Sequence, residues 1–553
     1  MLQHFKPIHP NFATSNQPFP DKNGTPYIMP HLVELVLLPQ ERHDENLIRQ
    51  KAARQTGLAA HQISHIEILK SSLDARSRQP IFRLRVEVFG AGEIFSPEPA
   101  ILDSFKPLQG GKKVIIVGAG PAGYFAAMEL LEAGIKPIVL DRGKDAQARR
   151  RDLRAIQQFG EVNPHSNYCF GEGGAGTYSD GKLYTRSVKR GSVQKALRLF
   201  VEHGAKSDIL TEAHPHIGSN KLPGVVQNMR QTILKYGGEV HFEQCVVDLI
   251  LKDGKILGVE TEPTGSGKGG SWLGDAVILA TGHSARDIYT LLHKKGILIE
   301  AKPFAFGVRV EHPQALIDSI QYKQNQRVEE LPAASYSLVC QTAGRGVFSF
   351  CMCPGGLIVP AATSPGEIVI NGMSMSRRDS PYANSGVVTS VEMDDLLPWA
   401  QHGPFTAMAF QAEAEQRLFK AGDGSQKAPA LRLPDFIQGK LSADLPKTSY
   451  IPGLHAAPLF DLLPDFIFQR LREGLLDFGK QMRGYYTEEA IVVATESRTS
   501  APVRIPRDPE TLMHPEVEGL YPCGEGAGYA GGIISAAMDG QKIVGFMVSR
   551  LHG

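Results

Sequence analysis

Apolar and polar residues alternate near the start of the chain. In IFRLRVEVF, residues 81–89, apolar and charged side chains take turns, which predicts a strand with one buried face. LVELVLL, residues 32–38, and the later HIEIL predict two further strands. Between them, Asp44 is a suitable N-cap and Gly57 a suitable stop signal for a helix. Residues 31–95 are therefore expected to form a small β-α-β-β domain.

Two segments without this periodicity flank the predicted domain. Residues 1–30 are expected to form an extended arm. Residues 96–112 contain three prolines and two glycines, a composition typical of a linker.

A different pattern follows the predicted linker. Val114–Val117 is a short, wholly apolar run and predicts a buried strand. Glycines then recur as G-x-G-x-x-G, followed by a predicted helix at 125–133, a strand at 138–140 and an acidic residue. These residues are Gly118, Gly120, Gly123 and Asp141. This order is typical of a dinucleotide-binding βαβ unit.

Each of these residues has a physical role in that unit. Gly118 permits the tight turn, Gly120 lets the backbone approach a pyrophosphate, and Gly123 lets the helix pack on the strand. The helix N-terminus then faces the negative charge. Asp141 can accept a hydrogen bond from a ribose hydroxyl. The pattern alone does not separate FAD from NAD.

Three later stretches carry further glycines and polar groups. CFGEGGAGTYSDGKL, residues 169–183, is a second glycine-rich loop. DAVILATGHSARD, residues 275–287, predicts a strand that ends at Ala-Thr-Gly. GLYPCGEGAGYAGGIISAAMDG, residues 519–540, predicts a strand, a Gly-Glu pair and the start of a helix.

These stretches resemble the FAD-binding elements of glutathione-reductase-type flavoproteins. More closely, the chain resembles a bacterial family of FAD-dependent dehydrogenases of unknown substrate, from about residue 30 to the end. The matching pieces are SSLDAR, GEGGAGTYSDGKLYTR, HPHIGSNKL, ATGHSARD, FCMCPGG, NGMS, ESRTSAPVRI and CGEGAGYAGGI. The resemblance implies the fold and FAD, with an acidic residue near the ribityl chain. Because no His, Cys or Tyr can be assigned to the flavin ring, FAD is expected to be bound non-covalently. This chain has Gly524-Glu525 where Gly-Asp is commoner.

The resemblance and the glycine motifs together predict the cofactor site. The candidates are Gly118, Gly120, Pro121, Ala122, Gly123, Asp141, Arg142, Gly174, Gly176, Thr177, Ser179, Asp180, Lys182, Val246, Thr281, Gly282, Gly524, Glu525, Ile533 and Ser535. They fall within residues 113–300 and 511–553, so the FAD-binding domain is split and residues 301–510 form an inserted substrate domain. The expected fold is α/β: a split Rossmann-like domain, an inserted α+β domain and the small N-terminal domain.

The predicted insertion has its own elements. Strands are expected at 304–310, 347–353 and 367–370, and helices at 406–419 and 465–483. We find no second G-x-G-x-x-G in a βαβ context. A separate NAD(P)H domain is therefore not expected, although NAD(P)H remains a candidate transient electron donor.

Cys351 and Cys353, in FCMCPGG, lie one residue apart. In an extended strand they would point to the same face. They could be metal ligands, a redox couple or packed apolar residues, but zinc needs about four ligands and only Cys340 is near in sequence. The glycine pair after Pro354 suits close approach to a ligand. We favour a wall that faces the flavin, with no metal.

Histidines and arginines supply candidates for proton exchange and anion binding. His214 and His216 alternate in AHPHIGSNKL, and His283 follows the Ala-Thr-Gly strand end. ATESRTSAPVRIPRD contains several arginines, of which Arg504 is the candidate carboxylate ligand. The tentative catalytic set is His214, His216, Cys351, Cys353 and Arg504. The basic run QARRRDLR, residues 147–154, is interpreted as an exposed helix face.

Composition narrows the class of protein. The 553 residues include 59 Lys and Arg against 58 Asp and Glu, a balance that argues against a nucleic-acid-coating surface. Six cysteines fit no disulfide framework, and no signal peptide or membrane span is visible, so reduced thiols in a cytoplasm are expected. Oligomeric state is left open.

The predicted function is an FAD-dependent oxidoreductase. It would act as a dehydrogenase or reductase, passing a hydride through flavin N5 to or from a small molecule. One alternative is a flavin monooxygenase of the single-domain type. Another is a flavin-containing binding or RNA-associated protein that uses the N-terminal domain and the basic run.

Overall fold

The computed structural model describes residues 19–20, 26–27, 30–185 and 191–551. Most of the predicted arm, residues 1–30, lies outside these ranges; β1 (Phe19–Pro20) and β2 (Pro26–Tyr27) form an antiparallel pair. The chain divides into two compact units, Met1–Glu98 and Pro99–Gly553.

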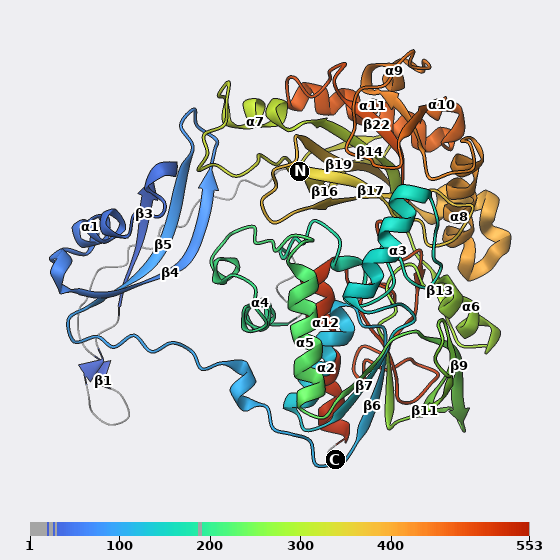
Figure 1. Ribbon diagram of the computed structural model, residues 1–553, viewed down its shortest axis with the longest axis horizontal. Coiled ribbons are helices and arrows are strands. Elements are labelled where there is room, and N and C mark those ends of the chain that lie inside the picture. Colours follow the sequence, from blue (N-terminus) through green and yellow to red (C-terminus); the bar gives the residue numbers. More distant parts are fainter. Residues whose placement is uncertain (1–18, 21–25, 28–29, 186–190, 552–553) are drawn as a thin grey trace. The chain divides into compact units, whose positions relative to one another are not determined.

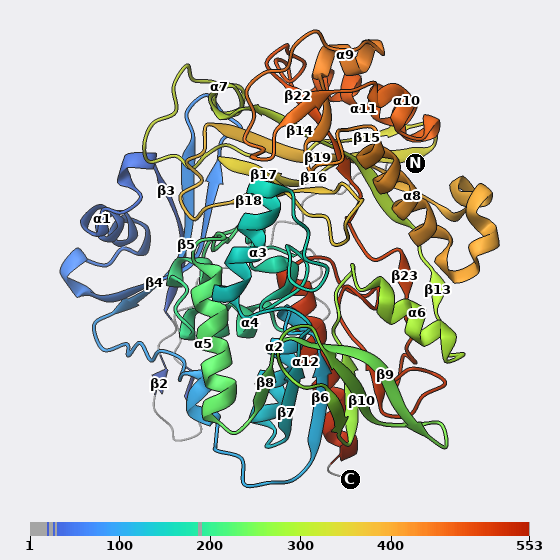
Figure 2. The ribbon, with the colours of Figure 1, turned by 45° about the vertical axis from the view of Figure 1, so that its right-hand side comes forward.

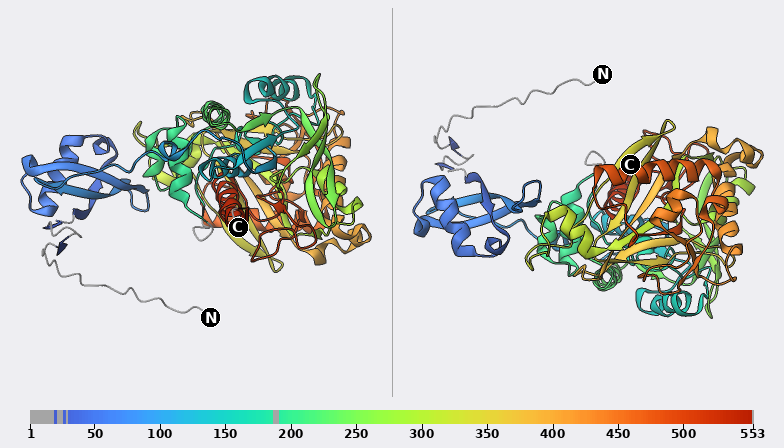
Figure 3. Two further views of the ribbon diagram at one scale, coloured as in Figure 1. Left: turned by 90° about the horizontal axis from the view of Figure 1, so that it is seen from below. Right: turned by 90° about the horizontal axis from the view of Figure 1, so that it is seen from above.

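The first unit confirms the predicted β-α-β-β order. Its sheet has the antiparallel order β3-β5-β4, and α1 packs against one face (Figure 3). The elements are β3 (His31–Leu37), α1 (Glu45–Thr56), β4 (Ile63–Asp74) and β5 (Ile81–Gly90). Asp44 caps α1 by accepting from the Leu47 N–H at 3.0 Å, and Gly57 ends it in the left-handed conformation. The alternating apolar residues of β5 are buried as predicted.

The second unit contains a five-stranded parallel sheet in the order β24-β12-β6-β7-β8, of which β6 and β7 are labelled in Figure 1. The strands are β6 (Lys113–Val117), β7 (Lys136–Leu140), β8 (Glu239–His241), β12 (Ala276–Leu279) and β24 (Leu520–Pro522). The C-terminal strand β24 pairs with β12, so the two ends of the unit share one sheet.

The buried run in β6 serves two cores because its side chains alternate. Val114 and Ile116 pack on the helical face of the sheet, and Ile115 and Val117 pack on the opposite face. The helical face is covered by α2 (Pro121–Glu132), α5 (Leu222–Lys235) and α12 (Ile533–Leu551). The opposite face meets an antiparallel sheet and α6 (Arg286–Lys294). That sheet comprises β9 (Gln244–Lys252), β10 (Lys255–Pro263) and β11 (Gly270–Leu273) (Figure 2).

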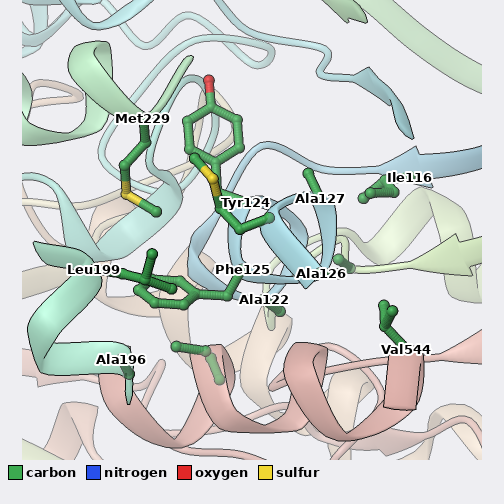
Figure 4. Close-up of a cluster of buried hydrophobic side chains, with 14 of the residues drawn as sticks. Ile116, Ala122, Tyr124, Phe125, Ala126, Ala127, Ala196, Leu199, Met229 and Val544 are labelled. Atoms are coloured by element: carbon green, nitrogen blue, oxygen red, sulfur yellow. The ribbon is translucent and has the colours of Figure 1, made fainter. Parts of the chain in front are cut away.

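Helices α2 and α12 lie side by side although 400 residues separate them in sequence (Figure 4). Ala122 and Ala126 of α2 face α12, and Phe125 turns toward Ala196 and Leu199 of α4 (Val193–Glu202). A Cβ on Gly540 of α12 would lie 2.2 Å from the Ala122 carbonyl oxygen. Only glycine therefore allows this approach.

A second, seven-stranded sheet lies within the predicted insertion. Its order is β15-β16-β19-β14-β22-β20-β21, antiparallel except for β20-β21. The strands are β14 (Phe304–Pro313), β15 (Val339–Thr342), β16 (Arg345–Cys353), β19 (Tyr382–Val391), β20 (Ala428–Arg432), β21 (Leu454–Ala456) and β22 (Ile491–Glu496). Further strand pairs are β17 (Gly356–Pro360) with β18 (Ile370–Ser374), and β13 (Glu300–Ala301) with β23 (Val503–Arg504).

Most predicted elements of the insertion are confirmed. The helices predicted at 406–419 and 465–483 are α8 (Thr406–Lys420) and α11 (Asp465–Gln481). The insertion also contains α7 (Gln314–Tyr322), α9 (Leu433–Gln438) and α10 (Leu459–Leu462), and α3 (Ala146–Phe159) lies before it in the chain. The strand predicted at 367–370 is wrong in its start, because residues 367–369 are buried but form no strand and β18 begins at Ile370. No helix in the described ranges is long and apolar enough to cross a bilayer.

Candidate functional site

A cavity extends from the carboxyl end of the parallel sheet to the seven-stranded sheet. Its wall combines the β6-α2 turn, the end of β7, the second glycine loop, the segment after β12 and the start of α12. The far wall comes from β16, β18 and the segment after β22, through Phe350, Cys351, Asn371, Gly372, Arg498 and Thr499. Ligands of open α/β sheets bind at the carboxyl ends of the strands.

The β6-α2 turn has the shape that a dinucleotide requires. A Cβ on Gly118 would lie 2.3 Å from the Ala280 carbonyl oxygen, and one on Gly123 would lie 2.0 Å from the Gly118 carbonyl oxygen. These two glycines are needed for the turn itself. At Gly120 the nearest atom to a Cβ is 3.9 Å away, so a side chain there would occupy the cavity at the α2 N-terminus. This open cradle fits a pyrophosphate.

Asp141 follows β7 and is fixed by backbone donors. Its carboxylate accepts from the N–H groups of Ala119 and Gly143, both at 2.8 Å. Each carboxylate oxygen has a further lone pair, so a ribose hydroxyl can still bind. Arg142 pairs with Asp287 and stacks on a cavity-lining phenylalanine.

Arg149 holds the second glycine loop through hydrogen bonds to its carbonyl groups. Its burial contradicts the prediction that residues 147–154 form an exposed helix face. It is fully buried and donates to the carbonyl oxygens of Asn167 (2.7 Å), Glu172 (2.8 Å) and Gly174 (2.9 Å). Burial lowers the pKa of Arg149. Reading the whole run 147–154 as an exposed face was therefore wrong at this position. Helical spacing could have shown it, because Arg149 shares a face with the buried Leu153.

Most predicted cofactor residues line the cavity. These are Gly118, Gly120, Pro121, Ala122, Asp141, Arg142, Gly174, Gly176, Ser179, Asp180, Lys182, Val246, Thr281, Gly282, Glu525 and Ile533. Four other predicted residues do not line the cavity: Gly123, Thr177, Gly524 and Ser535. Thr177 donates to the Glu172 carbonyl oxygen, and Ser535 accepts from the Gly531 N–H at 3.0 Å. The assignment to cofactor contacts stays a prediction.

The Gly524-Glu525 turn is held from α12. Asp539 accepts from the Gly524 N–H at 2.8 Å and forms a two-point ion pair with Arg507, at 2.7 and 3.0 Å. Burial raises the pKa of Glu525 to about 8, against the opposing charge of Lys302. A carboxyl group that is mostly protonated at neutral pH can donate a hydrogen bond to a cofactor hydroxyl.

A β-bulge separates the two cysteines of FCMCPGG. Between the pairs Phe350–Gly386 and Cys353–Asn384, β16 advances three residues while β19 advances two. Cys351, at φ +44°, is exposed on the cavity wall, whereas Cys353 is buried and its thiol donates to the Cys351 carbonyl oxygen at 3.2 Å. The expectation that both point to one face was therefore wrong. Desolvation by the surrounding protein atoms raises the pKa of both thiols, that of the buried Cys353 to about 12.

The glycine pair after these cysteines does not line the cavity. A Cβ on Gly355 would lie 1.8 Å from the Arg378 carbonyl oxygen, so its close approach is to another part of the chain. Among the described residues, no three His, Cys, Asp or Glu side chains group as metal ligands. The absence of a metal stays a prediction.

The other three predicted catalytic residues lie off the cavity wall. His214 is exposed and contacts the Tyr184 ring edge-to-face. His216 forms a backbone bridge with Lys182, and burial with nearby Arg378 lowers its pKa to about 4. Arg504 is exposed in β23, its guanidinium 5.5 Å from the Tyr529 ring. Their catalytic roles stay predictions.

Two residues that sequence reasoning ranked lower do line the cavity: His283 and Arg498. Burial and the neighbouring Arg498 lower the pKa of His283 to about 4, and its Nδ1 lies 2.8 Å from the Ser284 hydroxyl. Arg498 is held by Glu415 at 2.9 Å and Glu367 at 3.0 Å. The available signal was its place in the arginine-containing motif ESRTSAPVRI, two residues after the end of β22.

Family comparisons match three parts of the chain. A family described as "FAD binding domain" matches residues 112–156, and one described as "FAD-dependent protein, C-terminal domain-like" matches residues 303–499. A domain of unknown function matches residues 29–89. The cofactor is therefore FAD, bound non-covalently.

The chain is also similar to individual proteins and solved structures, over different lengths. An uncharacterized protein of Clostridium beijerinckii is 39% identical over 527 residues, covering 92% of this chain and 96% of that protein. A thiamine thiazole synthase of Methanococcus maripaludis is 27% identical over 187 residues, 33% of this chain and 60% of that one. A flavin-dependent brominase shares 12% identity over 80% of both chains (TM-score 0.35). A tetracycline destructase shares 13% over 80% and 82% (TM-score 0.32). By its full-length identity to the Clostridium protein, this FAD-binding chain belongs to the same family as that protein.

Proposed function

We propose that the protein is an FAD-dependent oxidoreductase, of the dehydrogenase or reductase kind, that transfers a hydride between its cofactor and a small molecule. One observation carries the proposal. The cavity does not end at the dinucleotide turn but continues to the wall formed by the seven-stranded sheet. A second ligand therefore has a place beside the cofactor, at the junction of two sheets, where ligand sites are common.

FAD, when bound, supplies the hydride chemistry. The chain supplies binding and orientation. Gly120 leaves the α2 N-terminus open to the phosphates, and Asp141 is fixed for the ribose. Gly531, Gly532 and Ile533 bring the start of α12 to the cavity, where its positive end favours negative charge.

His283 is the candidate for proton exchange on the cavity wall. With a pKa of about 4 its imidazole is neutral at pH 7, so its unprotonated nitrogen can accept a hydrogen bond or, as a weak base, a proton. The Ser284 hydroxyl at its Nδ1 fixes the ring. This assigns to His283 the role predicted for His214 and His216.

Anaerobic reduction tests the proposal. The purified protein, with FAD bound, is mixed with NADH or NADPH and then with a panel of quinones, enones and oxidised small molecules, while the 450 nm flavin band is followed. Reduction by a donor and reoxidation by one acceptor class, without oxygen, is expected. Prompt NADPH oxidation that releases hydrogen peroxide in air, with no anaerobic turnover, would instead identify a monooxygenase. If neither NADH nor NADPH reduces the flavin, the result favours the alternative of a flavin-containing binding protein.

A further inference from the structure

Lys182 carries a positive charge that the cavity wall does not neutralise. Lys182 lies at the end of the second glycine loop. Its backbone forms an antiparallel bridge with His216, which fixes the position from which the side chain extends. Its side chain lines the cavity and is 38% exposed, so the ammonium group is accessible from the cavity. An accessible, incompletely paired cation in a ligand cavity calls for an anionic partner.

The hydrogen bonds of Lys182 are incomplete. Its Nζ donates to the Met352 carbonyl oxygen and lies 3.5 Å from Asp180 Oδ2. An ammonium group has three N–H donors, so at least one is left for a ligand.

Among the described residues, the ion-paired group of Lys182, Asp180 and Arg378 has a net charge of one positive. Asp180 already pairs with Arg378 at 2.6 Å, so one carboxylate serves two cations. Burial opposes the ionisation of Asp180, but Lys182 and Arg378 lower its pKa overall, so it is charged.

The other cations of this wall are paired within the described chain. Arg309 is fully buried and pairs with Glu496 at 2.6 Å. Arg498 and Arg286 share Glu367 and Glu415, two cations with two carboxylates. Among the described residues, Lys182 is therefore the cation that remains available at this end of the cavity.

Asn371 of β18 adds a neutral donor to the same wall. Its Oδ1 accepts from the Gly372 N–H at 2.7 Å and from Arg309 at 3.4 Å. Its NH₂ group donates to no other described residue. Lys182 donates to the Met352 carbonyl oxygen, and Arg309, which donates to Asn371, also donates to the Cys351 carbonyl oxygen. Lys182 is therefore bonded directly to the bulge of β16, and Asn371 is connected to it through Arg309.

We propose that Lys182, assisted by Asn371, binds the carboxylate of an anionic small-molecule substrate. This proposal rests on the proposed function, whose second ligand it assigns to a chemical class. It also moves the predicted carboxylate-binding role from Arg504, which lies off the wall, to Lys182. A lysine acts on such a group as a point charge, and a charge-assisted hydrogen bond is worth roughly tenfold or more in affinity.

Titration with small carboxylates tests the proposal without turnover. Benzoate, acetate and succinate are added to the oxidised, FAD-loaded protein, and the shift of the flavin absorption bands gives a Kd. The variants are Lys182→Met, Lys182→Arg and Asn371→Leu. The control is Lys195→Met, because Lys195 pairs with Glu129 and Glu132 outside this cavity. The midpoint potential of each variant is measured in parallel.

We expect at least one carboxylate to shift the wild-type spectrum. Its Kd should rise about tenfold or more in Lys182→Met, a few-fold in Asn371→Leu, and stay within a few-fold in Lys182→Arg and in the control. Midpoint potentials should be unchanged. The two measurements distinguish a substrate carboxylate from the anionic reduced flavin as the partner of Lys182. If Lys182→Met had a more negative midpoint potential and unchanged carboxylate binding, the charge of Lys182 would stabilise the reduced flavin. That result would overturn the proposal.

Three other results would also overturn it: no spectral response to any carboxylate, equal affinity in Lys182→Met, or loss of FAD from every Lys182 variant. The last would place Lys182 in the cofactor site. Failure of the proposed function is distinguishable, because it appears as absent flavin reduction. Carboxylate binding that depends on Lys182 would still be observed in that case.

Discussion

The contact between α2 and α12 allows one substitution to be compared with its own control on the same helix. A Cβ on Gly540 would lie 2.2 Å from the Ala122 carbonyl oxygen and 3.1 Å from the Ala126 nitrogen. A Cβ on Gly545 would meet nothing within 4 Å. Gly540→Ala and Gly545→Ala therefore share the gain in helix propensity and differ in the steric cost.

The magnitude follows from these distances. Replacing glycine by alanine inside a helix stabilises it by about 1 kcal/mol, which both variants gain. At Gly540 ordinary contact begins at 3.4 Å, so the backbones must separate by 3.4 − 2.2 = 1.2 Å. Overpacking of this kind costs about 1–3 kcal/mol. We expect Gly545→Ala to be more stable than wild type and Gly540→Ala to be less stable than Gly545→Ala by about 1–3 kcal/mol.

Urea unfolding of both variants, followed by circular dichroism at one fixed FAD concentration, measures this difference. Because Ala122 lines the cavity, Gly540→Ala should also release FAD at lower urea, seen as a rise in flavin fluorescence. Equal stability of the two variants, or tighter FAD in Gly540→Ala, would refute the close contact between the helices.

Three further predictions follow from the cavity and its supports. Gly120→Val should purify without FAD, because the new side chain fills the open cradle; undiminished absorbance at 450 nm would contradict this. Arg149→Met should weaken FAD binding at least tenfold by leaving loop carbonyl groups unpaired, whereas exposed Arg150→Met on the same helix should not, as FAD titration would show. Glu525 has a folded-state pKa raised to about 8 from 4.5, so the free energy of unfolding of the apoprotein should fall as pH rises from 4.5 to 8. Urea unfolding at several pH values measures this fall, and an identical fall in Glu525→Gln would rule out Glu525 as its cause.

Local patterns in the sequence were sufficient for the cofactor class and much of the fold. The alternation in β5, the cap at Asp44 and the β6-α2 turn depend on residues close together in the chain. Periodicity and backbone freedom act over one strand or one turn, so they can be predicted before the tertiary structure is known.

Only the tertiary structure determines which reactive and charged side chains line the cavity and which of them are paired. Cys351 and Cys353 part at a bulge that depends on pairing between β16 and β19, which the spacing of two cysteines does not encode. Arg149 is buried because carbonyl groups of a distant loop surround it, although its own segment is strongly charged. Arg498 and Lys182 come from segments about 300 residues apart, and their availability depends on which carboxylates reach them. Whether a buried charge is paired depends on which residues the fold brings next to it. The sequence therefore identifies candidate residues, but only the tertiary structure shows which of them can bind a ligand.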